Sequence, residues 1–173
     1  GSGAFLIQAL ERLVQERRWV TEERERMTVS GALFDIDTIT RAVLTKNLYG
    51  VDINPESVEI TRLALWLHSA LPDRPLCSLD ENIRCGNSLV APDFYEQPGQ
   101  QSLFDEHARE RINVFDWRAA FPDVFSRPGG KAGFDIVVGN PPYVKLQNLL
   151  KVDADVADYL VNGRRKHGAA PIY

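Results

Sequence analysis

The feature that most constrains the fold is a short apolar run that leads straight into two prolines. Residues 134–145 read FDIVVGNPPYVK. The run from Phe134 to Val138 is nearly continuous and rich in β-branched residues, which predicts a strand buried on both faces of a parallel sheet. Asn140 then stands at the carboxyl end of that strand, where open α/β sheets bind ligands. The prolines that follow stiffen the turn.

The turn from Asn140 to Tyr143 carries groups suited to methylating a planar amine. The amine of an adenine ring is a poor nucleophile because its lone pair is delocalised into the ring. The Asn140 side-chain oxygen and the Pro141 carbonyl can each accept one N–H of that amine, and acceptors held rigid in advance stabilise a transition state. Tyr143 can stack on the ring, which is worth about 1–3 kcal/mol per base. An ordinary loop after a strand is the alternative interpretation.

Residues 1–14, GSGAFLIQALERLV, predict a helix that begins just after two glycines. Apolar residues recur at helical spacing at Leu6, Leu10, Leu13 and Val14. Glycines before a helix let the backbone approach a ligand closely at the helix N-terminus, which makes Gly1 and Gly3 candidate binding residues. A leading Gly-Ser is also a common remnant of an expression vector, and would then have no function.

Residues 48–53, LYGVDI, predict a strand that ends at Asp52. An acid at the end of the second strand commonly binds ribose hydroxyls in dinucleotide-type folds, although it usually follows the glycines by about 20 residues. Asp52 lies further on, so an insertion intervenes. The alternative is that Asp52 caps the next helix, a role for which Asn54 competes because Pro55 and Glu56 follow it. In that helix we expect one apolar face, before Pro72 stops it, formed by Ile60, Leu63, Ala64, Leu67 and Leu71.

Residues 82–89, NIRCGNSL, predict a brief strand through Ile83 and Cys85 that ends in a polar turn at residues 86–88. The polar atoms of this turn can face an adenine ring. A plain turn without function explains the segment equally well when it is considered alone.

Together these segments resemble the S-adenosylmethionine-dependent DNA adenine methyltransferases of the amino-methylating type. The most similar subgroup is the large methylase polypeptides of bacterial restriction–modification and phage-defence systems. GSGAFL resembles the glycine-rich cofactor loop, GVDINP the ribose-binding acid motif, GNSL the adenine-contacting motif and NPPY the catalytic motif. Residues 115–125, FDWRAAFPDVF, are also similar to what that subgroup carries before its NPPY strand. The resemblance covers most of residues 1–14 and 42–146.

The resemblance implies an α/β fold, a Rossmann-like class I methyltransferase core with a doubly wound, mostly parallel sheet. It implies S-adenosylmethionine as the cofactor, bound by Gly1, Gly3, Phe5, Asp52, Ile53 and Asn87. It implies double-stranded DNA as the substrate, with a flipped adenine bound by Asn140, Pro141, Pro142 and Tyr143. The sequence departs from the family at Asn87, where an Asp is more usual.

The family's glycine loop follows a strand and an Asp-Pro-Ala-like turn, and this sequence begins after both. We therefore expect residues 1–173 to be part of a catalytic domain without its first strand and its target-recognition domain. A sheet without its middle strand leaves backbone groups unpaired, so such a piece should be unstable or borrow a strand. A target-recognition or nuclease domain would lie in the parent chain or in a partner subunit.

Two segments look like insertions. Residues 15–35 begin with a run rich in Glu and Arg, which indicates an exposed helix end and loop. Residues 91–132 contain several prolines and Gly129-Gly130, and predict an excursion over the surface with short helical turns. Residues 146–162 resume an apolar rhythm that predicts a helix.

Composition narrows the possible classes of protein. The chain is 44% apolar and 25% charged, as is ordinary for a globular protein, and neither a signal peptide nor a membrane-length apolar run is visible in it, so we expect a cytoplasmic location. Two cysteines, Cys77 and Cys85, are too few for a four-ligand zinc site, and we expect them to be reduced and buried. The three histidines have no metal-binding spacing, and His68 is expected to be a structural residue on a helix.

The net charge of −4 is unfavourable for a DNA-binding domain acting alone, because DNA affinity depends on Lys and Arg that neutralise phosphates. Most of the DNA contacts are therefore expected outside this segment. A basic cluster from Arg164 to His167 either faces DNA or forms a solvated loop.

The sequence thus predicts a site-specific DNA adenine methyltransferase of a restriction–modification or phage-defence system. One alternative is a methyltransferase that acts on a glutamine side chain or on guanine in RNA, since similar NPPY loops serve the same planar-amine chemistry. A second is an inactive methyltransferase-like scaffold.

Overall fold

The computed structural model describes residues 3–27, 36–70, 75–96, 106–126, 132–140 and 154–166, with the side chains of the last helix as far as Leu160. The chain divides into two compact units, Gly1–Cys85 and Gly86–Tyr173. Within the described ranges, no helix is both long and apolar enough to cross a membrane.

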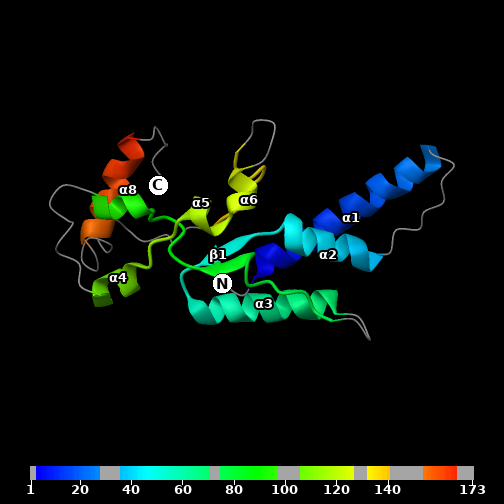
Figure 1. Cartoon of the computed structure of the whole chain (residues 1–173), viewed down its shortest axis with the longest axis horizontal. Coiled ribbons are helices and arrows are strands. Elements are labelled where there is room, and N and C mark those ends of the chain that lie inside the picture. The colour runs from blue at the N-terminus through cyan, green and yellow to red at the C-terminus, as the bar shows by residue number, and fades with distance from the viewer. Residues whose placement is uncertain are drawn as a thin grey trace. The chain divides into compact units, whose positions relative to one another are not determined.

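The first unit consists of three helices and a small parallel sheet (Figure 1). Strand β1 (Gly50–Asp52) pairs in parallel with β2 (Ile83–Cys85), with Asp52 opposite Cys85. Both strands lie where the sequence predicts them. The helices are α1 (Ala4–Met27), α2 (Ile36–Lys46) and α3 (Pro55–Ser69), and α3 connects the two strands. Parallel strands require such a crossover, since a tight hairpin would make them antiparallel.

The core of the first unit lies where α1, α2 and α3 meet the sheet. Leu10 is the buried residue of α1, and Leu6, Leu13 and Val14 pack against the same core, as the helical spacing predicts. Its buried apolar side chains are Leu10, Ile39, Val43, Leu44, Leu48, Val58, Leu65, Leu79 and Ile83. Two polar side chains fix the strands to this core. The Asn82 amide donates to the carbonyls of Thr45 and Leu48, at 3.2 and 3.0 Å. The Arg62 guanidinium donates to the Ile83 carbonyl.

The apolar face predicted for α3 is not the face that is buried. Val58, Thr61 and Leu65 are the buried residues of the helix. By contrast, Ile60, Leu63 and Leu67 are more than half exposed. The helix is apolar on more than one side, so periodicity alone does not select the face that meets the core. Ala64 is half-buried, and Leu71 lies outside the described residues.

The second unit is built mostly from short helices. Turn η1 (Pro92–Glu96), α4 (Glu106–Ile112), α5 (Trp117–Ala120) and α6 (Pro122–Phe125) lie in the stretch for which the sequence predicts short helical turns. Helix α8 (Ala154–Lys166) follows, and its Val156 is buried and its Leu160 half-buried. The apolar rhythm of the C-terminal segment is therefore confirmed for its described part.

Residues between 90 and 112 supply a second core with α8. Its buried members are Val90, Phe94, Ile112, Val156 and Tyr159. The Tyr159 hydroxyl donates to Asp93 Oδ1 at 2.7 Å and accepts from the Ala91 N–H at 3.3 Å. The Tyr159 ring also meets the Phe94 ring edge-on, with centroids 5.3 Å apart. These contacts attach α8 to η1.

The buried strand predicted for residues 134–138 is not formed. The segment is irregular, and Ile136, Val137 and Val138 are 78%, 80% and 69% exposed. A strand needs a hydrogen-bonded neighbour, and among the described residues none pairs with this segment as a strand. In the described part of the chain the structure is therefore a mixed helix–strand fold with a two-stranded parallel sheet, and a doubly wound sheet is not seen there.

We predict a sharp contrast between two leucines on α3. Leu65 is fully buried, so Leu65→Ala should lower the free energy of unfolding by about 2–5 kcal/mol. Leu67 is 79% exposed, so Leu67→Ala should change it by less than about 0.5 kcal/mol. Urea unfolding of the 173-residue chain measures both. Equal losses from the two substitutions would contradict the observed orientation of the helix.

We also predict an alkaline loss of stability that depends on Tyr159. Burial, the hydrogen bond to Asp93 and the charge of Asp93 raise the pKa of the Tyr159 hydroxyl from 10.0 to about 12. A raised pKa adds stability that is complete below the unfolded-state pKa and is lost as the pH rises through the folded-state pKa. The midpoint of unfolding should therefore decrease as the pH is raised from 10 to about 12. In Tyr159→Phe this part of the fall should be absent, with a lower midpoint at neutral pH because the hydrogen bonds are gone.

Candidate functional site

The start of α1 requires a glycine at position 3 for two structural reasons. Gly3 has a φ of +74°, which side chains rarely allow. A Cβ added there would also lie 2.8 Å from Thr61 Cγ2 of α3. The Gly3 carbonyl accepts a hydrogen bond from the Ile7 N–H at 3.0 Å, which begins the helix. The close approach that this glycine permits is therefore to α3, and the predicted Gly1 lies outside the described residues.

Asp52 ends strand β1 as the sequence predicts, and it does not cap α3. Asn54 is the capping residue, since its Oδ1 accepts from the Ser57 N–H at 2.8 Å, and Pro55 opens the helix. Asp52 Oδ1 instead accepts from the Asn54 N–H at 2.9 Å. Burial raises the pKa of the Asp52 carboxyl and the hydrogen bond from the Asn54 N–H lowers it, and the net pKa lies below its ordinary value. The carboxylate is therefore ionised at neutral pH.

Two large apolar side chains near these residues are exposed. Phe5, in the first turn of α1, is 60% exposed, and Ile53, next to Asp52, is 50% exposed. The first turns of α1 pack against β1, because a Cβ on Gly50 would lie 2.7 Å from Leu6 Cδ1. An ionised carboxylate can accept hydrogen bonds from ribose hydroxyls, and apolar side chains can cover a flat base. These residues therefore fit a nucleoside-containing cofactor.

In the second unit, the turn that follows β2 is held by main-chain bonds to residues 113–115. The Asn87 N–H donates to the Asn113 carbonyl at 2.6 Å, and the Phe115 N–H donates to the Val90 carbonyl at 2.9 Å. Asn87 also forms an isolated parallel bridge with Val114. Gly86 fits here because it has no side chain, since a Cβ on it would overlap Phe115 Cδ2.

The Asn87 side chain takes part in the same turn. Its Oδ1 accepts from the Leu89 N–H at 3.2 Å, and the residue is half-buried. This bond holds the amide close to its own backbone, as in an ordinary polar turn. Contact between Asn87 and a cofactor therefore stays a prediction.

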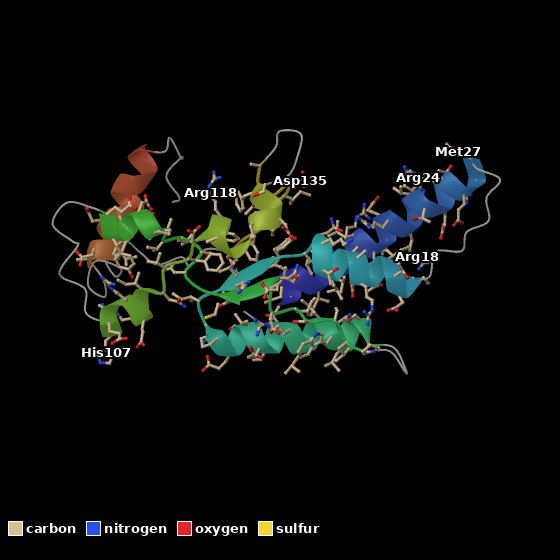
Figure 2. The ribbon with its side chains drawn as sticks, viewed as in Figure 1. Arg18, Arg24, Met27, His107, Arg118 and Asp135 are labelled. Carbon is tan, nitrogen blue, oxygen red and sulfur yellow. The ribbon has the colours of Figure 1, made fainter. Side chains whose placement is uncertain are left out.

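Sequence reasoning missed an aromatic cluster at residues 115–134. Its ring pairs have centroids 5.1–5.9 Å apart, and its members are Phe115, Trp117, Phe121, Phe125 and Phe134. Asp116 caps α5 by accepting from the N–H groups of Arg118 and Ala119. The Arg118 side chain, labelled in Figure 2, lies 5.2 Å from the centre of the Phe125 ring. The aromatic spacing of FDWRAAFPDVF was the available signal.

The predicted catalytic residues are only partly described. Asn140 belongs to the second unit and is exposed, whereas Pro141, Pro142 and Tyr143 lie outside the described residues. Gly139, the residue before Asn140, is in open space, where an added Cβ would meet nothing within 4 Å. Phe134 packs into the aromatic cluster at the start of this segment.

The remaining sequence predictions concern cysteine, histidine and metal. Cys77 is only partly buried and Cys85 is exposed, so the prediction of buried thiols is wrong. The exposure of Cys85 follows from its place at the end of a two-stranded sheet. His68 lies on α3, with its Nδ1 3.8 Å from Glu11 Oε1. Within the described ranges, no group of His, Cys, Asp or Glu could hold a metal ion.

Comparison with known proteins identifies one family. The sequence model described as Eco57I restriction-modification methylase matches residues 46–173. This range contains three of the four predicted motifs, from β1 through the turn at Asn140. No solved structure matches the chain.

Three curated relatives agree with this match. A candidate type II restriction enzyme and methyltransferase of Methanocaldococcus jannaschii is 41% identical over 52% of the chain. The type II restriction enzyme and methyltransferase of the Eco57I system of Escherichia coli is 26% identical over 86%. The adenine-specific methyltransferase PglX of Streptomyces coelicolor is 31% identical over 86%. The matches span only 8%, 14% and 12% of these relatives, respectively.

The tight contact at Gly86 gives a testable prediction. Gly86→Ala should force Phe115 to shift and should lower the free energy of unfolding by about 1–3 kcal/mol, as overpacking does. Gly139→Ala is the matched control, since it meets open space and should be neutral or stabilising by up to about 1 kcal/mol. Urea unfolding measures both. If Gly86→Ala unfolded at the same urea concentration as the original chain, the close packing of Phe115 on this turn would be refuted.

Proposed function

The chain belongs to the Eco57I restriction-modification methylase family. We propose that it is part of an S-adenosylmethionine-dependent methyltransferase that acts on the exocyclic amine of adenine in DNA. The adenine-specific name of the Streptomyces coelicolor relative supports the choice of base. The names of the other two relatives, which include a restriction enzyme, support a restriction–modification or phage-defence context.

The observation that carries the proposal is the environment of Asp52. An ionised carboxylate stands at the carboxyl end of a parallel strand, with Phe5 and Ile53 exposed in the same unit. In open α/β sheets this edge binds ligands. We propose that Asp52 accepts hydrogen bonds from the ribose hydroxyls of the cofactor while Phe5 and Ile53 cover its adenine. Gly1 and Gly3 would bind at the start of α1, and Asn87 would contact the base.

Asn140 is the proposed catalytic residue. When bound, S-adenosylmethionine supplies an electrophilic methyl group. The Asn140 side-chain oxygen and the Pro141 carbonyl each accept one N–H of the target amine, which localises the nitrogen lone pair toward that methyl group. With the cofactor held at Asp52, the nitrogen of the amine bound by Asn140 and Pro141 would receive the methyl group, and the amine proton would then leave to solvent. Pro142 keeps the turn stiff, and Tyr143 stacks on the target ring.

The proposal requires DNA with its target adenine out of the helical stack, because Asn140 cannot reach the amine in a paired base. Three arginines of α1 do not suit phosphate binding, since Arg12, Arg18 and Arg26 each lie beside a glutamate of the same helix. Arg18 is among the α1 side chains labelled in Figure 2. The parts that hold DNA and read its sequence are therefore proposed to lie in a target-recognition domain or partner outside these residues.

The relatives weigh against the other readings of the sequence. Their names describe restriction enzymes and an adenine-specific methyltransferase, which favours DNA adenine over a glutamine side chain or RNA guanine. The sequence retains all four residues from Asn140 to Tyr143, which favours an active enzyme over a scaffold.

We predict that Asn140→Ala abolishes methyl transfer and leaves cofactor affinity within about twofold, because Asn140 acts on the target amine. The test uses the full-length natural protein that contains this sequence, labelled S-adenosylmethionine and bacterial DNA. Mass spectrometry identifies the methylated nucleoside, and a binding titration gives the cofactor affinity.

Asn47→Ala is the matched control, since Asn47 is an exposed residue at the end of α2. It should methylate adenine at the original rate. Undiminished turnover by Asn140→Ala would disprove the catalytic role. Label found in protein or RNA instead of DNA would overturn the choice of substrate.

A further inference from the structure

Trp117 contacts both of the candidate segments of the second unit. Its indole N–H donates to the Ser88 carbonyl at 3.2 Å. Its ring meets the Phe134 ring edge-on, with centroids 5.6 Å apart. Ser88 belongs to the turn proposed to contact the cofactor, and Phe134 begins the segment that ends at Asn140. One rigid side chain therefore joins the two segments.

Phe134 anchors the catalytic segment to the aromatic cluster. Its ring centroid lies 5.8 Å from that of Phe121 and 5.8 Å from that of Phe125, in addition to its contact with Trp117. The residues from Ile136 to Val138 are largely exposed. Within the described residues 132–140, the segment that ends at Asn140 is thus anchored in the aromatic cluster at Phe134.

Trp117 is itself held firmly. It is the first residue of α5, and the Asp116 carboxylate caps that helix with bonds of 2.9 and 3.0 Å to the backbone N–H groups of Arg118 and Ala119. Two main-chain hydrogen bonds, between Asn87 and Asn113 and between Val90 and Phe115, also connect the cofactor turn to the backbone just before Trp117. Trp117 therefore cannot shift without moving one of the two segments.

We propose that Trp117 is a positioning residue that fixes the separation between the turn at residues 86–88 and the catalytic segment at residues 134–140. The inference rests on the proposed function, since it matters only if these segments bind the cofactor and the target amine. Reaction requires the reacting atoms to come within about 3–3.5 Å, and a misplacement of about 1 Å can cost roughly 100-fold in rate. The hydrogen bond to Ser88 positions the cofactor turn, and the ring contact with Phe134 positions Asn140.

Two substitutions separate these contributions. Trp117→Phe keeps a ring against Phe134 and removes the indole N–H, whereas Trp117→Leu removes both contacts. Trp19→Leu is the control, because Trp19 lies exposed on α1 in the other unit. The full-length natural protein is titrated with S-adenosylmethionine to obtain Kd and the fraction of active sites. Single-turnover methylation of DNA then gives the rate constant per active site.

Trp117→Phe should raise Kd by about three- to tenfold, the loss expected for one neutral hydrogen bond, and should leave the rate constant nearly unchanged. Trp117→Leu should raise Kd by a similar factor and also lower the rate constant by roughly 10- to 100-fold. Trp19→Leu should change neither. In cofactor-free protein, amide hydrogen exchange of residues 86–90 should be faster in both Trp117 variants than in the control.

Phe134→Leu keeps the experiment decisive if Trp117→Leu does not fold. It should lower the rate constant and leave Kd unchanged. The proposal is overturned if Trp117→Phe and Phe134→Leu lose only thermal stability, with the original Kd and rate constant per active site. A wild-type protein that binds no S-adenosylmethionine would instead overturn the proposed function itself.

Discussion

The first unit depends on the buried side chain of Asn82. Its amide satisfies the carbonyls of Thr45 and Leu48 at the end of α2, and its own carbonyl accepts from the Gly50 N–H that begins β1. Unsatisfied carbonyls in such a buried place would cost free energy comparable to lost hydrogen bonds. Asn82 therefore fixes where β1 starts relative to β2, through its side-chain amide and its main-chain carbonyl together. The register of the two strands, and with it the position of Asp52, follows from that constraint.

The parts of the fold that were predictable from the sequence are those set by local chemistry. Strand β1 and the Asn54-Pro55 helix start are encoded within a few residues, by β-branched side chains and by a capping amide before a proline. The buried face of α3 is not encoded locally, because the helix is apolar on several sides and only α1, α2 and the sheet select among them. Residues 134–138 have strand composition, but a strand also needs a neighbour, which composition cannot supply.

The candidate site divides in the same way. The end of β1 at Asp52 follows from local pattern, and so does the turn at residues 86–88. The connection between that turn and the stretch from Asn113 to Trp117 is non-local, formed by backbone bonds and by the fit of Phe115 against Gly86. Hydrophobic periodicity in the sequence does not predict such contacts. The aromatic residues that make them were visible in the sequence only as an unexplained motif.

The exposed run at Ile136, Val137 and Val138 also bears on self-association. An exposed, β-branched segment that joins no strand among the described residues is a template on which identical segments can stack into cross-β aggregates. Its flanks oppose this outcome. Asp135 places a charge before the run, and Pro141 and Pro142, which lack N–H donors, follow within a few residues. The prolines proposed to stiffen a catalytic turn thus also act as gatekeepers against fibril growth.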